Sequence, residues 1–342
     1  MNMRSWAEQM IYTERKKALP VLSFPCVQYL YITVRELVAD ANHQAIGMRS
    51  IIDHYDMAAA LGYMDLSVEA EAFGANIVYS SDKIPTVTGR LLSSEESVDA
   101  LKIPKVGEGR TQTNLDSIRK SRILIHDRPV FAQCIGPFSL AGRLLNVNEI
   151  MPLCYEDPDM VLKLLRKVTD FLREYAAAFK TAGANGIIIA EPLAGLLSPE
   201  LVTRFSTEFV REIIDSVQDN HFLVIYHNCG NSVPFLLNSI IDCGAAGFHF
   251  GDSADMVEML DKVPSDRLVL GNISPAKVFN GSSVKSVEIE TMKLLQKCGG
   301  YKNFIPSSGC DLPPDVDLEN VTAFFRVIEG FYYRKWLRDA IA

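Results

Sequence analysis

Three residues have the types and spacing of a metal site: His227, Cys229 and Cys310. His227 and Cys229 end the apolar run FLVIYHNCG, and the alternation of side chains along a strand places both on the same side. Cys310 follows another apolar run much later in the chain. One imidazole nitrogen and two thiolates suit zinc, and three protein ligands leave a fourth position open, as in catalytic sites. The spacing fits equally well a strand-end histidine and two cysteines that pack as small apolar residues.

Other polar residues follow apolar runs in the same way. Glu191 comes directly after GIIIA, where it could be a fourth metal ligand, a base beside the metal, or the cap of a helix beginning near Pro199. His249, in GFHFGD, is expected to bind substrate or to orient the histidine of the H-x-C pair. Asn272, in GNISP, is expected to line the site, and Glu69 to contact substrate unless it belongs to a solvated helix face. A thiol nucleophile with a histidine base is less consistent with side chains that point side by side.

The elements that must position these residues follow a repeating order. From about Arg128 onward, short apolar runs alternate with amphipathic helical segments, a pattern typical of parallel strands joined by crossover helices. The predicted strands are Val130–Ile135, Gly186–Ala190, Phe222–His227, Gly247–Phe250, Leu268–Gly271 and Asn303–Pro306. The predicted helices include Pro158–Ala182, Pro199–Gln218 and Leu318–Arg338.

One or two further strands near Ser23 and Met64 bring the total to about eight, which predicts an α/β fold of the TIM (β/α)8 barrel type. A doubly wound open sheet is the alternative, but no glycine-rich dinucleotide fingerprint follows the first strand. In either fold, ligands bind beyond the carboxyl ends of the strands. The candidate residues other than Glu69 stand at such ends.

The N-terminal third is less regular than the rest. Helices are expected over Thr33–Met48 and Ile51–Gly62, followed by a polar, turn-rich run from Pro85 to Thr111. Neither a repeat nor a linker interrupts the chain. We therefore expect one domain over residues 1–342, with a less regular N-terminal helical extension (1–125) and regular β/α units (126–342).

Composition excludes several classes of protein. With 342 residues, 48% of them hydrophobic, the chain can build a large core, which excludes disorder. A net charge of -8 gives no general attraction to nucleic acid or an anionic membrane. Seven scattered cysteines are unlike a disulfide scaffold, and there is neither a signal-peptide pattern nor an apolar stretch of membrane-spanning length. We expect a soluble, cytoplasmic protein.

Four segments, IGPFSLAGRLL, IYHNCGN, LVLGNISP and FIPSSGCDLPP, resemble the uroporphyrinogen decarboxylase superfamily. Within it they resemble the zinc-dependent corrinoid methyltransferases of the methylcobamide:coenzyme M type. The resemblance implies a TIM barrel in which His227, Cys229 and Cys310 hold Zn²⁺. It implies that zinc stabilises a substrate thiolate, which takes the methyl group of a methylcobamide. A related branch moves a methyl group from an O- or N-methyl donor to the corrinoid.

The resemblance also implies partners and an alternative. The chain has no D-x-H-x-x-G corrinoid-binding signature, so the corrinoid is expected free or on a separate corrinoid protein. Asp65 falls where the decarboxylases carry the aspartate that binds the tetrapyrrole, which makes it a second candidate catalytic residue beside Glu191. Uroporphyrinogen decarboxylation is therefore the alternative, although an Arg-rich N-terminal stretch is missing and Cys310 replaces a histidine. A non-catalytic barrel that binds a corrinoid protein is the third hypothesis.

Overall fold

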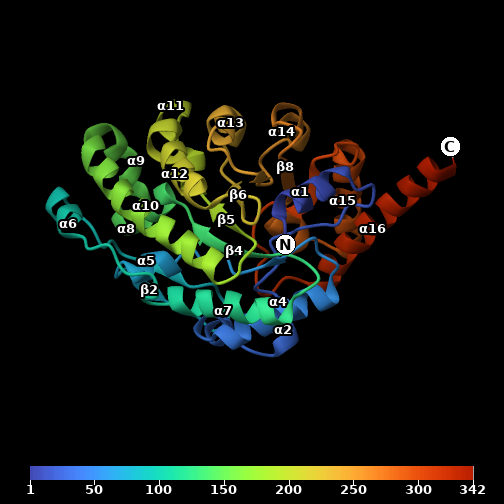
Figure 1. The fold of residues 1–342 in the computed structure, drawn as a ribbon, viewed down its shortest axis with the longest axis horizontal. Coiled ribbons are helices and arrows are strands. Elements are labelled where there is room, and N and C mark those ends of the chain that lie inside the picture. The colour runs from blue at the N-terminus through green and yellow to red at the C-terminus, as the bar shows by residue number, and fades with distance from the viewer. Residues whose placement is uncertain (342) are drawn as a thin grey trace.

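Seven parallel strands form one curled sheet in the computed structural model, which describes residues 1–341 (Figure 1). The strands are neighbours in chain order, as in a (β/α) barrel, and nearly every strand residue is buried. Burial on both faces explains why they read as unbroken apolar runs. The strands are β1 (Ala60–Leu61), β4 (Val130–Ile135), β5 (Gly186–Ala190), β6 (Leu223–Asn228), β7 (Gly247–Phe250), β8 (Leu268–Ile273) and β9 (Phe304–Ser308).

An extended segment, residues 18–23, stands in place of an eighth strand. The Leu19 amide donates to the Pro306 carbonyl of β9 at 2.9 Å, and the Ala58 amide, just before β1, donates to the Ala18 carbonyl at 2.9 Å. The Ser307 hydroxyl adds a bond to the Leu19 carbonyl at 2.7 Å. This segment, here called the seam, therefore joins the two edges of the sheet. The strand expected near Ser23 is thus present as an irregular connection, and the predicted barrel is confirmed with seven regular strands.

Helices surround the sheet on its outer side (Figure 1). Helix α10 illustrates how the sequence specifies such a helix. It begins where Asp157 accepts from the Met160 amide, with Pro158 as its first residue. One side of the helix carries buried leucines, valines and aromatic residues, which pack against the core. The helices after the first crossover are α7 (Thr111–Leu124), α8 (Pro137–Leu145), α9 (Val147–Glu156), α10 (Pro158–Thr181), α11 (Pro199–Val202), α12 (Glu208–Val217), α13 (Val233–Ile241), α14 (Met256–Lys262), α15 (Val284–Cys298) and α16 (Leu318–Ile341), with short turns η1 (Leu193–Leu196), η2 (Thr203–Thr207) and η3 (Pro275–Phe279).

The N-terminal part differs from its prediction in two places. The helix expected over Thr33–Met48 is divided at Asp40, whose extended backbone ends one helix and whose carboxylate caps the next. The prediction of a helix over Ile51–Gly62 is wrong beyond His54, because pairing with β4 makes Ala60–Leu61 a strand. The elements here are α1 (Met3–Tyr12), α2 (Cys26–Leu30), α3 (Val34–Ala39), α4 (Ala41–His54), α5 (Val68–Ala72), β2 (Asn76–Val78), β3 (Thr86–Thr88) and α6 (Glu95–Ala100).

One hydrophobic core runs from α1 to α16 through both sides of the sheet. The helix predicted over Pro199–Gln218 is present as three consecutive pieces, because a wider turn over Thr203–Thr207 interrupts it. None of the helices within residues 1–341 is both long and apolar enough to cross a membrane. Residue 342, the last of the expected domain, lies outside the described residues.

Candidate metal centre

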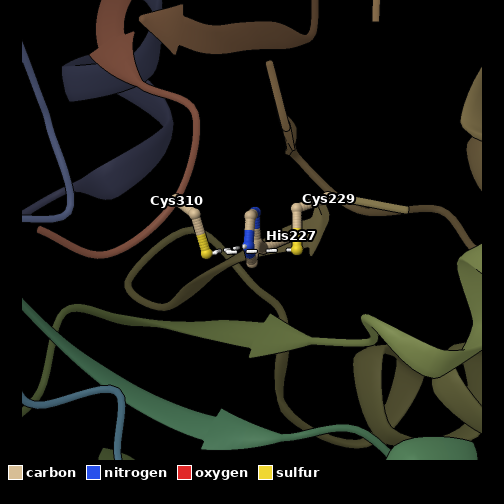
Figure 2. Close-up of side chains that lie close together, drawn as sticks. All are labelled: His227, Cys229 and Cys310. Carbon is tan, nitrogen blue, oxygen red and sulfur yellow. Dashed lines mark hydrogen bonds between the residues drawn. The ribbon is translucent and has the colours of Figure 1, made fainter. Parts of the chain in front are cut away.

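The three predicted donors meet at the carboxyl ends of two strands (Figure 2). His227 lies on β6 and Cys229 just after it, while Cys310 follows β9. One ligand atom from each residue lies within 4.8 Å of the other two. The Cys310 sulfur is 3.5 Å from His227 Nε2 and 4.0 Å from the Cys229 sulfur. Among residues 1–341, no other group of three His, Cys, Asp or Glu donors converges as closely.

The backbone around these donors is held by close approaches and hydrogen bonds. The Gly309 amide donates to the Ile273 carbonyl at 2.7 Å, which anchors the loop of Cys310 to β8. Gly251 lies against Cys229: a Cβ at position 251 would come within 2.6 Å of the cysteine Cα. Only glycine allows this approach, so the sequence GFHFGD shapes the site through its glycine.

A second histidine fixes the orientation of His227. His249 Nε2 lies 2.8 Å from the Ser308 carbonyl and 2.9 Å from the Ser307 hydroxyl, which itself donates to Leu19. Both partners accept, so Nε2 of His249 carries the hydrogen. Burial, with the neighbouring His227, lowers the pKa of His249 well below its ordinary value and keeps the ring neutral.

The neutral His249 ring has a free lone pair on Nδ1, which lies 2.6 Å from Nδ1 of His227. His227 therefore donates from Nδ1, a hydrogen that the His249 carbonyl also faces at 3.2 Å. This tautomer leaves the lone pair of His227 on Nε2, the atom that faces the thiols. His249 is buried and contacts His227 through Nδ1, which fits the orienting alternative, while its contact with substrate stays a prediction.

The two thiols differ in acidity although they lie side by side. The hydrogen bond from Cys310 lowers the pKa of Cys229, which loses its proton first. The same bond, with burial, raises the pKa of Cys310 to about 12. Both cysteines are half-buried, and neither takes part in a disulfide.

Glu191 is occupied by a helix end. Its carboxylate accepts from the backbone amides of Phe138 and Ser139 at 2.8 and 2.9 Å and from the Ser139 hydroxyl at 2.6 Å. Burial raises its pKa to about 7 although these bonds oppose the shift. Of the three alternatives, the structure therefore shows a cap, but of α8 instead of the helix near Pro199. Its carboxylate is not among the three converging donors.

Asp65 and Glu69 lie in a buried network at the end of β1. Arg110 forms an ion pair with Asp65, donates to the Ser67 hydroxyl at 2.7 Å, and reaches Glu71 at 2.6 Å. Asp65 also accepts from the Ser67 amide at 3.0 Å. Glu69 accepts weakly from the Ile135 amide at 3.4 Å, and burial raises its pKa to about 8. Its burial excludes the solvated-face interpretation.

Asn272 supports a loop near the cluster. Its side-chain amide donates to the carbonyls of Gly251 at 2.9 Å and Ala254 at 2.7 Å. The amide hydrogens are thereby engaged, and the side chain holds the turn after β7. The role of Asn272 in lining the site stays a prediction.

Comparison with known proteins places this chain in a family. The family model "Uroporphyrinogen decarboxylase (URO-D)" matches residues 26–331. The chain belongs to the URO-D family. Two relatives are methylcobamide:CoM methyltransferase MtbA of Methanosarcina acetivorans, 26% identical over 86% of this chain and 84% of its own, and uroporphyrinogen decarboxylase of Ruthia magnifica, 22% identical over 83% of each.

Solved structures show the same fold. A methyltransferase from Methanosarcina mazei superposes with a TM-score of 0.84 at 22% identity, covering 97% of this chain and 99% of its own. A B12-independent methionine synthase from Shewanella sp. W3-18-1 superposes with a TM-score of 0.58 at 13% identity, covering 90% and 96%. At 22% and 13% identity, these superpositions establish that this chain folds as a barrel.

The sequence analysis assigns no role to two residues near the site of this URO-D family member. Arg110 stands in a turn-rich segment with no periodic pattern, so nothing in its spacing indicates that it pairs with Asp65. Asp311 directly follows Cys310, and both its carboxylate oxygens are buried without a hydrogen-bond partner. An acidic residue beside a candidate ligand was the available signal for Asp311.

Proposed function

We propose that this protein is a zinc-dependent methyltransferase that moves a methyl group between a corrinoid and a thiol, or from an O- or N-methyl donor to the corrinoid. The observation that carries the proposal is the convergence of His227, Cys229 and Cys310 within 4.8 Å at the carboxyl ends of the strands. The corrinoid and the thiol coenzyme M come from the names of relatives such as the Methanosarcina enzyme. At 26% identity these names support the reaction class.

The donor set fits zinc. Imidazole and thiolate ligands are those that zinc prefers, and the His227 Nε2 lone pair already faces the thiols. A bound zinc ion would keep one position open, where a substrate thiol would lose its proton at neutral pH. Cys229, whose pKa is lowered, is the thiol that most readily supplies a thiolate ligand.

The residues around the donors prepare the site for this chemistry. His249 holds the His227 ring through the bond between their Nδ1 atoms, and the β9 residue Ser308 holds His249 in turn. In the net reaction the methyl group passes from cobalt to the thiolate sulfur, which forms a thioether and leaves the corrinoid reduced. Since no corrinoid-binding signature is present in the sequence, we propose that the corrinoid arrives free or on a partner protein.

Uroporphyrinogen decarboxylation is the second candidate, because relatives of that name match the chain and Asp65 lies at the end of β1. Its carboxylate, however, is engaged by Arg110 and Ser67. A carboxylate held in this way is less available to the pyrrole N–H groups of a tetrapyrrole. The converging thiols also have no role in that reaction, so we favour methyl transfer.

The test is zinc content followed by turnover. We expect about one zinc per chain in the wild type, and loss of most of it in His227→Ala, Cys229→Ser and Cys310→Ser. Cys298→Ser, which alters a buried cysteine on α15 that is not among the three converging donors, should retain the metal. Circular dichroism would verify that each variant is folded.

Turnover distinguishes the candidates. When methylcobalamin is mixed with each of a panel of thiols, its absorption spectrum should disappear only in the presence of the zinc-loaded wild-type protein. A folded wild type that binds no zinc would refute the metal site. Carbon dioxide from uroporphyrinogen, without any demethylation of methylcobalamin, would favour the decarboxylase. Neither activity, together with tight binding of a corrinoid protein, would favour the non-catalytic barrel.

A further inference from the structure

A cavity of about 650 Å³ lies between residues 15–18, residues 54–56 and the middle of α16. The first of these segments leads into the seam and the second leads into β1, where the Ala58 amide bonds to the Ala18 carbonyl at 2.9 Å. The cavity therefore lies toward the amino ends of the strands, whereas the proposed metal donors lie at the carboxyl ends. Its volume is that of a site for a small molecule.

A buried cation without a counter-charge lines this cavity. Lys16 is 8% exposed, and its ammonium group donates to three backbone carbonyls, those of Met10, Ile11 and Lys302. These carbonyls bind its hydrogens but do not neutralise its charge. Burial, and next the charge of Lys335, lower the pKa of Lys16 to about 8. No ion pair among the described side chains includes Lys16, so an anion in the cavity would compensate it.

Arg15 is a second cation of the cavity that has no carboxylate partner among the described side chains. It is exposed, and its guanidinium carbon lies over a tyrosine ring of α16, 5.5 Å from the ring centroid. A guanidinium group held in this way still offers the N–H groups of its own plane to an anion. Lys17 and Arg326 also line the cavity, but each has an acidic partner at 2.7 Å. With four cations against the carboxylates of Asp56 and Glu329, the cavity is positive in a chain whose net charge is -8.

Aromatic rings line the same cavity. Tyr55 and Tyr332 are 4% and 2% exposed, and the Tyr55 ring stacks on that of Phe325 with the two centroids 4.9 Å apart. Rings of this kind bind a flat apolar group through burial and stacking. An inorganic anion would leave this surface in water, and an uncharged ring compound would leave Lys16 uncompensated. A molecule that carries both a flat apolar group and an anionic group satisfies both features.

We propose that this cavity is an accessory site for a small organic anion, a molecule in which a flat apolar group carries a phosphate or a carboxylate. The site shares no residue with the metal centre, so the inference does not depend on the proposed function. Substrates of TIM barrels bind at the carboxyl ends of the strands, so this ligand is not the substrate. The segments that line the cavity come together only when the seam has closed the barrel, and a bound anion therefore stabilises the closed barrel.

Phenyl phosphate, inorganic phosphate and phenol test this, because they carry both features, the anion alone and the ring alone. Titration calorimetry on the full chain would give their dissociation constants. We expect phenyl phosphate to bind about tenfold or more tightly than either of the other two, and to raise the temperature of thermal unfolding. Equal affinities for phenyl phosphate and inorganic phosphate, or no saturable binding of phenyl phosphate at millimolar concentrations, would overturn the inference.

Two variants of exposed residues locate the site. Arg15→Met removes a cation of the cavity and should weaken phenyl phosphate binding by about five- to tenfold. Thr322→Trp keeps every charge but fills the cavity from α16, and it should abolish the binding. The matched control is Arg173→Met, because Arg173 is exposed on α10, does not line the cavity and faces Asp170 only at 3.9 Å. If Arg173→Met weakened the binding as much as Arg15→Met, the effect would be one of general charge and the inference would be overturned.

A variant of the metal centre separates the inference from the proposed function. His227→Ala should bind phenyl phosphate as the wild type does, because the cavity and the metal donors lie toward opposite ends of the barrel. Loss of that binding in a folded His227→Ala protein would place the anion at the metal centre and overturn the inference. A wild type that binds phenyl phosphate in this way but binds no zinc would support the inference while the proposed function failed. Thermal unfolding without ligand would verify that each variant is folded.

Discussion

Replacement of His249 by alanine tests the proposed metal centre at a residue that is not itself a ligand. Its ring makes contacts of 2.6 Å to His227, 2.9 Å to Ser307 and 2.8 Å to Ser308. Alanine removes all three, and only the backbone carbonyl of residue 249, at 3.2 Å, still faces Nδ1 of His227, so the hydrogen and the ring are held less firmly. The lone pair on Nε2 is then present for only part of the time.

The expected effect is a zinc dissociation constant raised by about 10- to 100-fold, the usual result of losing a hydrogen-bond partner behind a metal-binding histidine. This corresponds to about 1.4 to 2.8 kcal/mol of binding free energy. His249→Gln, whose side-chain oxygen is able to accept a hydrogen bond, should recover part of the loss. Zinc affinity would be measured by competition with a chromophoric chelator at fixed pH.

His221→Ala is the control, because His221 is exposed and lies on the surface near the N-terminus. It should bind zinc as the wild type does. Thermal unfolding would verify that the His249 variants are folded at the assay temperature. A folded His249→Ala protein with wild-type zinc affinity would refute the tautomer argument.

Two further predictions concern the acids of the barrel mouth. Burial raises the pKa of Glu69 from its ordinary 4.5 to about 8, so the folded protein keeps a proton that the unfolded chain releases. The free energy of unfolding should therefore fall as pH rises from about 4.5 to 8, and the fall should be smaller in Glu69→Gln. Urea unfolding at a series of pH values measures both. The same pH dependence in the wild type and the variant would contradict this prediction. Arg110→Met leaves Asp65 unpaired inside the protein and should cost about 3 to 5 kcal/mol in urea unfolding, whereas a loss below about 1 kcal/mol would contradict a buried ion pair.

The strands were the most predictable part of the fold. Val130–Ile135, Gly186–Ala190 and Gly247–Phe250 have the bounds expected from the sequence, because residues buried on both faces of a parallel sheet must be apolar throughout. The alanines before Leu61 have helical preference, yet their pairing with β4 decides their conformation. The seam, where a strand is predicted near Ser23, is not a regular strand, and one of its bonds to β9 comes from a serine side chain.

The sequence could predict only the part of the site whose residues follow one another on a single strand. His227 and Cys229 point the same way because side chains alternate along β6. The meeting with Cys310 was implied by family resemblance, since proximity across the sheet cannot be derived from spacing. The roles of His249 and Glu191 depend on which backbone groups fold against them, such as the Ser308 carbonyl and the Phe138 amide.

The seam determines when the metal centre can be assembled. Ser307 is bonded to Leu19 across 288 residues of chain, and the next turn carries Cys310. During synthesis, His227 and Cys229 emerge together and can meet an ion as a two-donor pair, but Cys310 joins them only after β9 has been made and has found residues 18–23. Contacts this distant in sequence form slowly. Capture of the proposed metal would therefore report that the barrel has closed, which would make zinc uptake a probe of the last step of folding.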